Sequence, residues 1–424
     1  MKKIAGSVFQ TTQVHPVATL HIFCRVVDNY GDIGVCWRLA RQLLIDYRVT
    51  LWVDDLVSFQ RICSEVEPAL AQQICGGVEV CHWNDQGMDD QAIPVDVVGD
   101  VVIEAFACTL PAAYVTAMAD RAGHTGERVP VWINLDYLSA EHWVEGCHEL
   151  VSVHPQLGLK KTFFFPGFTE RTGGLLVEPL LAQQRAHFQS DTRIALDFFH
   201  AIGVIAPALA SSLSADELMH ACKVSLFCYP DAPVAQLLTA WSTLDYRSTN
   251  GQPVICFVPD GVANAALQAW SGAIAPLPFV TTPVAIRRGS LTVVRLPFMS
   301  QDQYDRLLWA CDLNFVRGED SFVRAQLAGK PMVWHIYPQE QDAHREKLQA
   351  FMQKYQASMS TNLMMPMQAL WLSWNGVEGN FQPTWSQLHD ILPLWQHHAQ
   401  AWCDQISKNK SLAQSLSQFI QKIS

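Results

Sequence analysis

The sequence predicts an α/β protein made of two doubly wound domains that face each other across a cleft. Segments of β-like character alternate with helical segments in two separate series along the chain. Between the series, residues 160–174 are rich in Pro and Gly, so we expect a non-regular connection or hinge there. The 424 residues are also too many for one compact core and suit two domains.

The first series starts with a β-like segment from Thr19 to Val27, which is broken by residues 28–34. Apolar residues at helical spacing predict a helix over Val35–Tyr47, and Val49–Val53 is expected to be the next strand. This is a βαβ unit, which implies parallel strands and a right-handed crossover. Further strands of this domain are expected at Val78–Cys81, Val97–Ala105 and Pro130–Leu135.

The second series predicts the second domain, with helical segments between its strands. Ligands of such domains bind beyond the carboxyl ends of parallel strands, so the site is expected in the cleft. The strands of this series are expected at Val224–Tyr229, Pro253–Val258, Leu291–Leu296, Leu313–Val316 and Pro331–Ile336.

The composition excludes several classes of protein. Hydrophobic residues make up 49% and charged residues 16%, which indicates a globular chain, and the net charge of -11 argues against a general nucleic-acid binder but suits a basic protein partner. The 12 cysteines are scattered without a C-x-x-C pair, so we expect free thiols in a reducing cytoplasm. No histidine pattern predicts a structural metal. Without a signal peptide or an apolar run of about 20 residues, the protein is expected to be soluble and cytoplasmic.

The segment from Asp312 to Pro331 is typical of a strand, a tight turn and a helix, with Asp320 or Ser321 as the expected cap. The turn places Arg317 and free backbone N–H groups together, which makes an anion site. Glu319 and Asp320 lie at the same point, so a ligand with both phosphates and hydroxyls, such as a nucleotide sugar, would suit it. A capped helix with an exposed ion pair worth about 0.5 kcal/mol is also consistent with this pattern.

Gly31 and Gly34 allow the backbone to approach a ligand closely at the end of the first strand. Asp28 and Asp32 lie near the start of the following helix, where carboxylates are favourable in any case. Two interpretations therefore remain open for these acids, a capping role and a general base at the cleft. Arg38 on this helix is expected to belong to a solvated face.

Two other segments combine aromatic and polar residues at strand ends. Phe298 could stack on a flat base while Gln301 hydrogen-bonds the edge of that base, but core packing and a surface position also suit them. Phe227 and Tyr229 end another strand, where they either line the cleft or close the core.

Taken together, these segments resemble the EarP family, the protein-arginine rhamnosyltransferases that modify bacterial elongation factor P. The resemblance covers nearly the whole chain after about the first twenty residues. It implies a GT-B glycosyltransferase fold, with two Rossmann-like domains facing across a cleft. The matching stretches are residues 23–43, 164–169, 226–229 and 317–326, the last continuing from 331 to 339.

With this resemblance, four parts of the chain are expected. They are an N-terminal extension over residues 1–18, an N-terminal Rossmann-like acceptor-binding domain over 19–180, a C-terminal Rossmann-like nucleotide-sugar-binding domain over 181–395, and a C-terminal helix over 396–424 that returns to the first domain.

The resemblance implies transfer of L-rhamnose from dTDP-β-L-rhamnose to one arginine of elongation factor P, with inversion at the sugar carbon. That modification helps ribosomes to move through polyproline stretches. The expected partners are therefore elongation factor P and the donor, with no metal or other cofactor, no direct nucleic acid and no membrane. We expect a monomer.

The resemblance also implies roles for single residues. Asp32 would be the general base, Asp28 a supporting acid, and Glu319 a member of the active-site motif that holds the ribose or the donor. Phe298 would stack on thymine and Gln301 would read its edge. A guanidinium has a pKa above about 12 and no spare lone pair, so a carboxylate has to orient it and take a proton. The full expected donor site is Tyr30, Gly31, Phe227, Tyr229, Phe298, Gln301, Arg317, Gly318, Asp320, Ser321 and Tyr337.

Two alternatives stay open on the sequence alone. The chain could be another GT-B glycosyltransferase, with a small molecule, a lipid or a glycan as acceptor. It could instead be a non-catalytic protein that binds a nucleotide sugar or a translation factor and forms no product. A doubly wound scaffold by itself does not decide between them.

Overall fold

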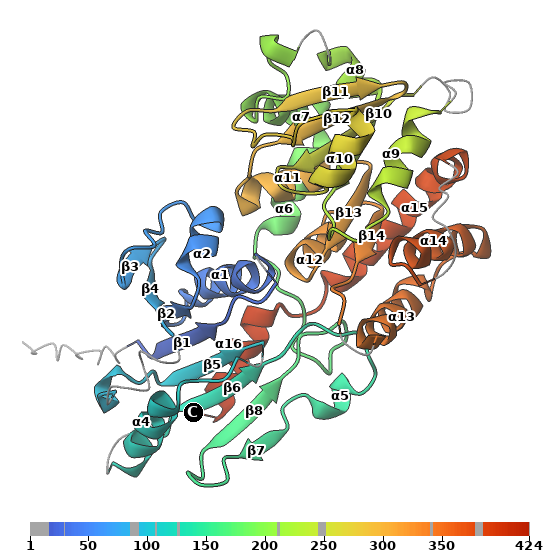
Figure 1. Ribbon diagram of the computed structural model, residues 1–424. Helices are drawn as coiled ribbons and strands as arrows, with labels where there is room; N and C mark the ends of the chain where they lie inside the picture. Colours follow the sequence, from blue (N-terminus) through green and yellow to red (C-terminus); the bar gives the residue numbers. More distant parts are fainter. Residues whose placement is uncertain are drawn as a thin grey trace, which may run out of the picture.

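The computed structural model describes residues 17–28, 30–84, 93–106, 108–124, 128–209, 213–244, 252–339, 342–377 and 385–423. The expected extension over residues 1–18 lies almost wholly outside these described residues. Two sheets, each covered by helices on both faces, form two domains that lie beside each other (Figure 1). The predicted pair of doubly wound α/β domains is therefore confirmed.

The N-terminal sheet has eight strands in the order β3-β4-β2-β1-β5-β6-β8-β7. The six central strands, β4, β2, β1, β5, β6 and β8, run parallel to one another. The edge strands β3 and β7 are each antiparallel to their neighbour. From β1 the chain passes to β2 on one side and later to β5 on the other, so a crevice opens at the end of β1. The strands are β1 (Thr19–Cys24), β2 (Arg48–Val53), β3 (Gln72–Cys75), β4 (Val78–His82), β5 (Val101–Ala105), β6 (Val131–Leu135), β7 (Val151–Val153) and β8 (Lys160–Phe164).

The helices of this domain pack on both faces of its sheet. One face is covered by α1 (Gly31–Leu43), α2 (Leu56–Ile62) and the last helix of the chain, α16 (Leu412–Ile423). The other face is covered by α4 (Ala112–Gly123). Figure 1 shows α16, drawn in red, lying within the blue and green domain. The remaining short elements are η1 (Val95–Val97) and α5 (Val144–Cys147).

The C-terminal sheet has six strands in the order β11-β12-β10-β9-β13-β14, of which β11 alone is antiparallel to its neighbour. The chain winds outward in both directions from the β9–β13 pair, so the crevice of this sheet lies at the ends of these two strands. The strands are β9 (Cys222–Leu226), β10 (Val254–Pro259), β11 (Val284–Arg288), β12 (Leu291–Leu296), β13 (Leu313–Arg317) and β14 (Met332–His335).

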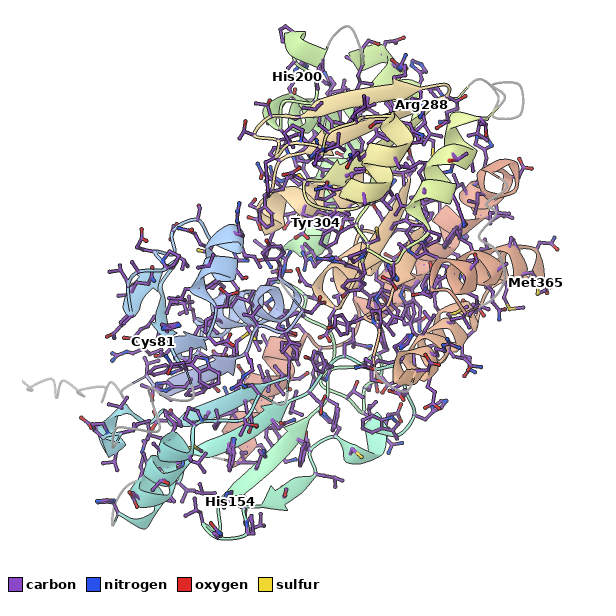
Figure 2. The ribbon with its side chains drawn as sticks, viewed as in Figure 1. Cys81, His154, His200, Arg288, Tyr304 and Met365 are labelled. Carbon is purple, nitrogen blue, oxygen red and sulfur yellow. The ribbon has the colours of Figure 1, made fainter. Side chains whose placement is uncertain are left out.

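Helices surround this second sheet and join it to α16. They are α6 (Leu181–Ser190), α7 (Thr192–Ala201), η2 (Pro207–Leu209), α8 (Ala215–His220), α9 (Val234–Ser242), α10 (Asn264–Ser271), α11 (Gln301–Ala310), α12 (Asp320–Leu327), α13 (Ala343–Gln356), α14 (Thr361–Trp374) and α15 (Trp385–Ile406). Figure 2 shows side chains filling both domains, with Tyr304 of α11 on the side of its domain that faces the other one.

Several expected boundaries were wrong. The first strand ends at Cys24 and not at Val27, because the chain leaves the sheet early. Helix α1 begins at Gly31 and not at Val35, because its first turn lies within the segment 28–34 that was expected to be a break. The segment over residues 160–174 is not wholly irregular, since β8 occupies its first five residues and pairs with β6. The edge strand β7 was missed because it has only three residues, Val-Ser-Val, too few for an alternating pattern to be recognised.

The prediction of free thiols is confirmed, because all twelve cysteines are unpaired and only Cys147 is more than slightly exposed. Within the described part of the chain, no helix is long and apolar enough to cross a membrane.

We predict that Leu416→Ala lowers the stability of the protein by about 2–5 kcal/mol, because Leu416 of α16 is fully buried in the N-terminal core and its loss leaves a cavity. Thermal unfolding measures the effect. The matched control is Leu394→Ala on α15, whose side chain is 54% exposed and should change the midpoint little. Equal midpoints for the two variants would contradict a structural role of α16.

Candidate functional site

The cleft between the domains contains two neighbouring hollows of about 750 Å³ and about 900 Å³. They have Asp28, Gly31, Gly318 and Glu319 in common, so they form one continuous site. Asp28 and Gly31 follow β1, whereas Gly318 and Glu319 follow β13. The site therefore lies where the crevices of the two sheets meet.

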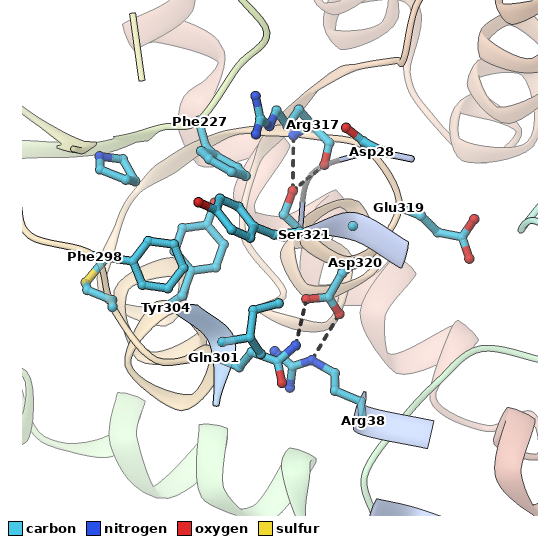
Figure 3. A pocket seen from close by; sticks show the side chains of 16 residues that line it. Asp28, Arg38, Phe227, Phe298, Gln301, Tyr304, Arg317, Glu319, Asp320 and Ser321 are labelled. Atoms are coloured by element: carbon cyan, nitrogen blue, oxygen red, sulfur yellow. Dashed lines mark hydrogen bonds and ion pairs between the residues drawn. The ribbon is translucent and has the colours of Figure 1, made fainter. Parts of the chain in front are cut away.

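Aromatic side chains line the first hollow (Figure 3). Phe227 follows β9, Phe298 follows β12, and Tyr304 lies on α11. Phe298 is 41% exposed and packs edge-on against Tyr30 of the other domain, with 5.2 Å between the ring centroids. A flat, apolar ligand such as a nucleobase suits these surfaces.

Arg317 lies beside this aromatic wall at the end of β13. Its guanidinium carbon is 4.4 Å from the ring centroid of Phe227 and 4.7 Å from that of Tyr229, and its Nη1 donates to the Cys228 carbonyl at 3.3 Å. These contacts hold the cation at the N-terminus of α12. A cation and a helix N-terminus together favour a bound anion.

The expected cap of α12 was wrong. Glu319 is the N-cap residue and its side chain does not cap. The Ser321 hydroxyl instead accepts from the Arg317 N–H at 3.1 Å and donates to the Arg317 carbonyl. Asp320 pairs with Arg38 across the cleft, with 3.0 Å between Oδ1 and Nε. The helix start is therefore left without a side-chain acceptor, which suits an anionic ligand.

Gly318 is required where the two domains touch. Its φ is +60°, and a Cβ there would lie 2.7 Å from Asp28 Oδ2 and 3.0 Å from the Tyr229 hydroxyl. These two groups hydrogen-bond to each other, because the Tyr229 hydroxyl donates to Asp28 Oδ2 at 2.6 Å. Tyr229 thus differs in position from the other expected donor residues. It is buried, lines neither hollow, and forms a hydrogen bond between the two domains.

Neither Asp28 nor Asp32 caps α1, so the capping interpretation was wrong. Tyr30 is the N-cap residue and makes no side-chain cap. Asp32 Oδ2 instead accepts from the backbone N–H groups of Val27 and Asp28, at 2.8 and 2.9 Å. The second oxygen of Asp28, Oδ1, is buried and has no hydrogen-bond partner among the described residues. A buried acceptor in a cleft without a partner indicates a position for a ligand donor.

Acidic groups converge in the second hollow. Burial raises the pKa of Asp32, although the N–H groups of Asp28 and Val27 oppose this effect. Burial also raises the pKa of Glu319 to about 7, while its Oε2 accepts from the Leu138 N–H at 2.9 Å. Tyr137 lies beside both acids, and burial together with their charges raises the pKa of its phenol. Carboxylates whose pKa is raised by burial suit proton transfer.

Arg38 was expected on a solvated face, and this was wrong. It is 2% exposed and forms ion pairs with Glu178, Asp305 and Asp320. Burial alone would lower the pKa of Arg38, but the three carboxylates raise it. The sequence carried no clear signal for this position, since Arg41 and Gln42 follow Arg38 at i+3 and i+4 and give α1 a polar strip beside it.

The other expected donor residues line the hollows. Gln301 donates from Nε2 to the Gly34 carbonyl at 3.1 Å, so its amide reaches the other domain, and its reading of a base edge stays a prediction. Tyr337 is 41% exposed in the second hollow. Sequence reasoning missed Tyr137 and Lys347, which face each other there with Nζ 5.4 Å from the ring centroid.

One group of possible metal ligands occurs among the described residues, and it lies outside the cleft. Cys63, Glu65 and Cys75 have ligand atoms within 4.8 Å of one another. None of them lines either hollow, so this group has no part in the chemistry of the site.

Comparisons with known proteins agree on one family. A family model described as elongation factor P (EF-P) rhamnosyltransferase EarP matches residues 20–421. A protein-arginine rhamnosyltransferase of Pseudomonas putida is 45% identical over 404 residues, which cover 95% of this chain and 98% of the relative. A second, from Neisseria meningitidis, is 33% identical over 410 residues, covering 95% and 96%.

A solved structure is also similar over both domains. It is described as the structural basis for EarP-mediated arginine glycosylation of translation elongation factor EF-P. It is 32% identical, has a TM-score of 0.61, and covers 96% of this chain and 99% of that chain. The two facing Rossmann-like domains are those of the expected GT-B fold, which is confirmed.

We predict that Glu319→Gln raises thermal stability at pH 8 and that the gain shrinks as the pH falls. The folded-state pKa of Glu319 is about 7, against an ordinary value of 4.5. The folded protein therefore binds the proton more tightly, so stability falls as the pH rises from 4.5 through 7. Gln carries no charge and can still accept from the Leu138 N–H. Unfolding midpoints at pH 5 and pH 8 test this, and an equal effect at both would contradict it.

Proposed function

The chain belongs to the EarP family of EF-P rhamnosyltransferases, and we propose that it transfers L-rhamnose from dTDP-β-L-rhamnose to an arginine of EF-P within the interdomain cleft. The observation that carries this proposal is the meeting of Asp28, Asp32 and Glu319 opposite the Arg317 turn. Carboxylates on one side suit a guanidinium acceptor, and the turn suits a diphosphate leaving group.

The donor occupies the first hollow in this proposal. Its thymine stacks against Phe298, between the aromatic residues of both domains. Its diphosphate lies at the uncapped start of α12, where Arg317 and the backbone N–H groups of the helix stabilise it. The rhamnose then reaches the junction of the two hollows, where the free oxygen of Asp28 accepts from a sugar hydroxyl.

The acceptor arginine approaches through the second hollow. The acids that line it are Asp28, Asp32 and Glu319, and a guanidinium presents several N–H donors that can bind to more than one of them. Asp32 Oδ2 is engaged by two backbone N–H groups, which fixes the direction of its other oxygen. That oxygen serves as the general base.

The reaction is a single displacement. The sugar C1–O bond to the diphosphate breaks, and the leaving oxygen keeps the electron pair. A guanidinium nitrogen forms the new C1–N bond from the opposite face, and the proton that it releases passes to Asp32. The buried carboxylates also stabilise the positive charge that develops at the sugar ring. Burial raises the pKa of Asp32, which makes it a stronger base than a solvated aspartate.

The acceptor is a folded protein, and the charge of this chain suits such a partner. The net charge of -11 attracts a basic surface and so favours an encounter with a loop that presents an arginine. Because EF-P is a translation factor, we propose that the reaction takes place in the cytoplasm.

We predict that Asp32→Asn lowers the rate of EF-P rhamnosylation at least about 100-fold, because the general base is lost while the fold is kept. Intact mass of EF-P after incubation with dTDP-β-L-rhamnose measures the gain of one deoxyhexose. The matched control is Asp46→Asn, an exposed acid just beyond the same helix, which should leave the rate unchanged.

Two results would overturn parts of this proposal. Wild-type protein that binds the donor but gives EF-P no added mass would move the acceptor elsewhere, and free arginine or peptide fragments would then be tested. Normal turnover by folded Asp32→Asn would remove Asp32 as the base.

We predict that Phe298→Ala raises the donor KM about tenfold, because stacking of a base on an aromatic ring contributes about 1–3 kcal/mol. Steady-state kinetics with varied dTDP-β-L-rhamnose measure the change. Phe279→Ala is the control, since this ring is 79% exposed and lines neither hollow. An unchanged KM for Phe298→Ala would place the base elsewhere.

A further inference from the structure

Arg38 connects three parts of the molecule that meet behind the donor hollow. It lies on α1 of the N-terminal domain, whereas Asp305 and Asp320 belong to α11 and α12 of the C-terminal domain, and Glu178 belongs to the connection between the domains. Figure 3 shows Arg38 reaching Asp320 at the edge of the hollow.

The guanidinium contacts all three carboxylates, two of them through hydrogen bonds. Nη1 donates to Glu178 Oε1 at 3.0 Å, and Nη1 and Nη2 donate to the two oxygens of Asp305 at 3.1 Å each. Nε lies 3.0 Å from Asp320 Oδ1 in an ion pair that lacks hydrogen-bond geometry. Only a planar fork reaches three carboxylates in fixed directions, whereas a lysine ammonium is a single point charge. The geometry of this contact therefore specifies both the position and the rotation of α1.

Arg38, Arg324, Glu178, Asp305 and Asp320 form one ionic cluster. Arg324 holds Asp305 and Glu178 in place independently of Arg38. Arg324 of α12 binds Asp305 in a bidentate manner, at 2.9 and 2.7 Å, and its Nη1 donates to Glu178 at 2.5 Å. Arg324 therefore fixes the carboxylates of Asp305 and Glu178 even without a contact from the N-terminal domain. Loss of Arg38 would not leave either of them without a partner.

The cluster forms a wall between two spaces. Arg38 lines both the donor hollow and a larger hollow of about 1710 Å³ beside the connection between the domains. If the domains separate, water can hydrate these charges, so the cluster resists opening much less than a dry apolar contact would. Buried ion pairs of this kind contribute to unique geometry more than to stability.

The general base lies on the same helix as Arg38. Asp32 is six residues earlier in α1, which places it about 9 Å along the helix axis. The groups that hold the leaving diphosphate are at the start of α12, the helix that carries Asp320 and Arg324. Rotation or sliding of α1 against α12 would therefore move the base relative to the sugar carbon. A misplacement of about 1 Å is enough to slow a reaction 100-fold.

We propose that Arg38 is a positioning residue, which sets α1 against α11 and α12 so that Asp32 faces the sugar carbon of the donor. The proposal rests on the proposed function, because it concerns the rate of that transfer. It differs from donor binding, since the base, sugar and diphosphate contacts of the C-terminal domain do not involve Arg38.

Arg38→Lys tests the proposal, because it keeps the charge and removes the fork. We expect kcat for EF-P rhamnosylation to fall about tenfold or more, while the Kd for dTDP stays within about threefold and the unfolding midpoint stays close to that of the wild type. Arg48→Lys is the control, an exposed arginine of the same domain, and should match the wild type in all three measurements. Wild-type turnover is established first, so a failure of the proposed function is recognised separately.

Three results would overturn the proposal. The first is a kcat within about twofold of the wild type in folded Arg38→Lys. The second is a loss of dTDP affinity as large as the loss of kcat, which would give Arg38 a role in donor binding. The third is a fall in kcat that disappears when the assay temperature is lowered well below the unfolding midpoint, which would indicate a structural role only. If Arg38→Lys does not fold, Arg38→Gln is measured in the same way and judged by the same three results.

Discussion

The proposed mechanism depends on one constraint, which is that its reacting groups belong to different domains. The carboxylates of Asp28 and Asp32 follow the first strand of the N-terminal sheet, and the phosphate-binding turn at Arg317 ends a strand of the C-terminal sheet. The two meet through the hydrogen bond from Tyr229 to Asp28, at a point where Gly318 leaves no room for a side chain. In the proposed mechanism, domain closure is therefore a condition for catalysis, and donor binding and chemistry are separable.

The electrostatics of the cleft show the cost of this arrangement. Glu319 is buried enough for its pKa to rise to about 7, and burial also raises the pKa of Asp32. Such groups destabilise the folded protein at neutral pH when no cation is bound. A guanidinium between them relieves this penalty, so the stored unfavourable energy favours the acceptor arginine over a neutral side chain. The acids that line the aromatic hollow are Asp28 and Glu319, which both hollows share, and Asp320, which pairs with Arg38.

The local chemistry of turns made much of the fold and site predictable. The strand, turn and helix at Arg317 and the break after the first strand were both recognisable, because glycine, acids and apolar periodicity lie close together in sequence. The pairing of Arg38 was not recognisable in this way, since its partner Asp305 is 267 residues away. The expected caps of α1 and α12 failed for a related reason: Ser321 binds the backbone of Arg317, Asp320 pairs with Arg38, and Asp32 binds the loop before its helix.

The proposed transfer is a single displacement with the base and the leaving group on opposite sides of the sugar. The configuration of the product tests this claim most directly, and NMR of the rhamnosylated arginine in EF-P measures it. Starting from dTDP-β-L-rhamnose, the account predicts an α-linked rhamnosyl arginine. A β-linked product would require two displacements or attack from the same face, and would contradict the assignment of Asp32 opposite the diphosphate site.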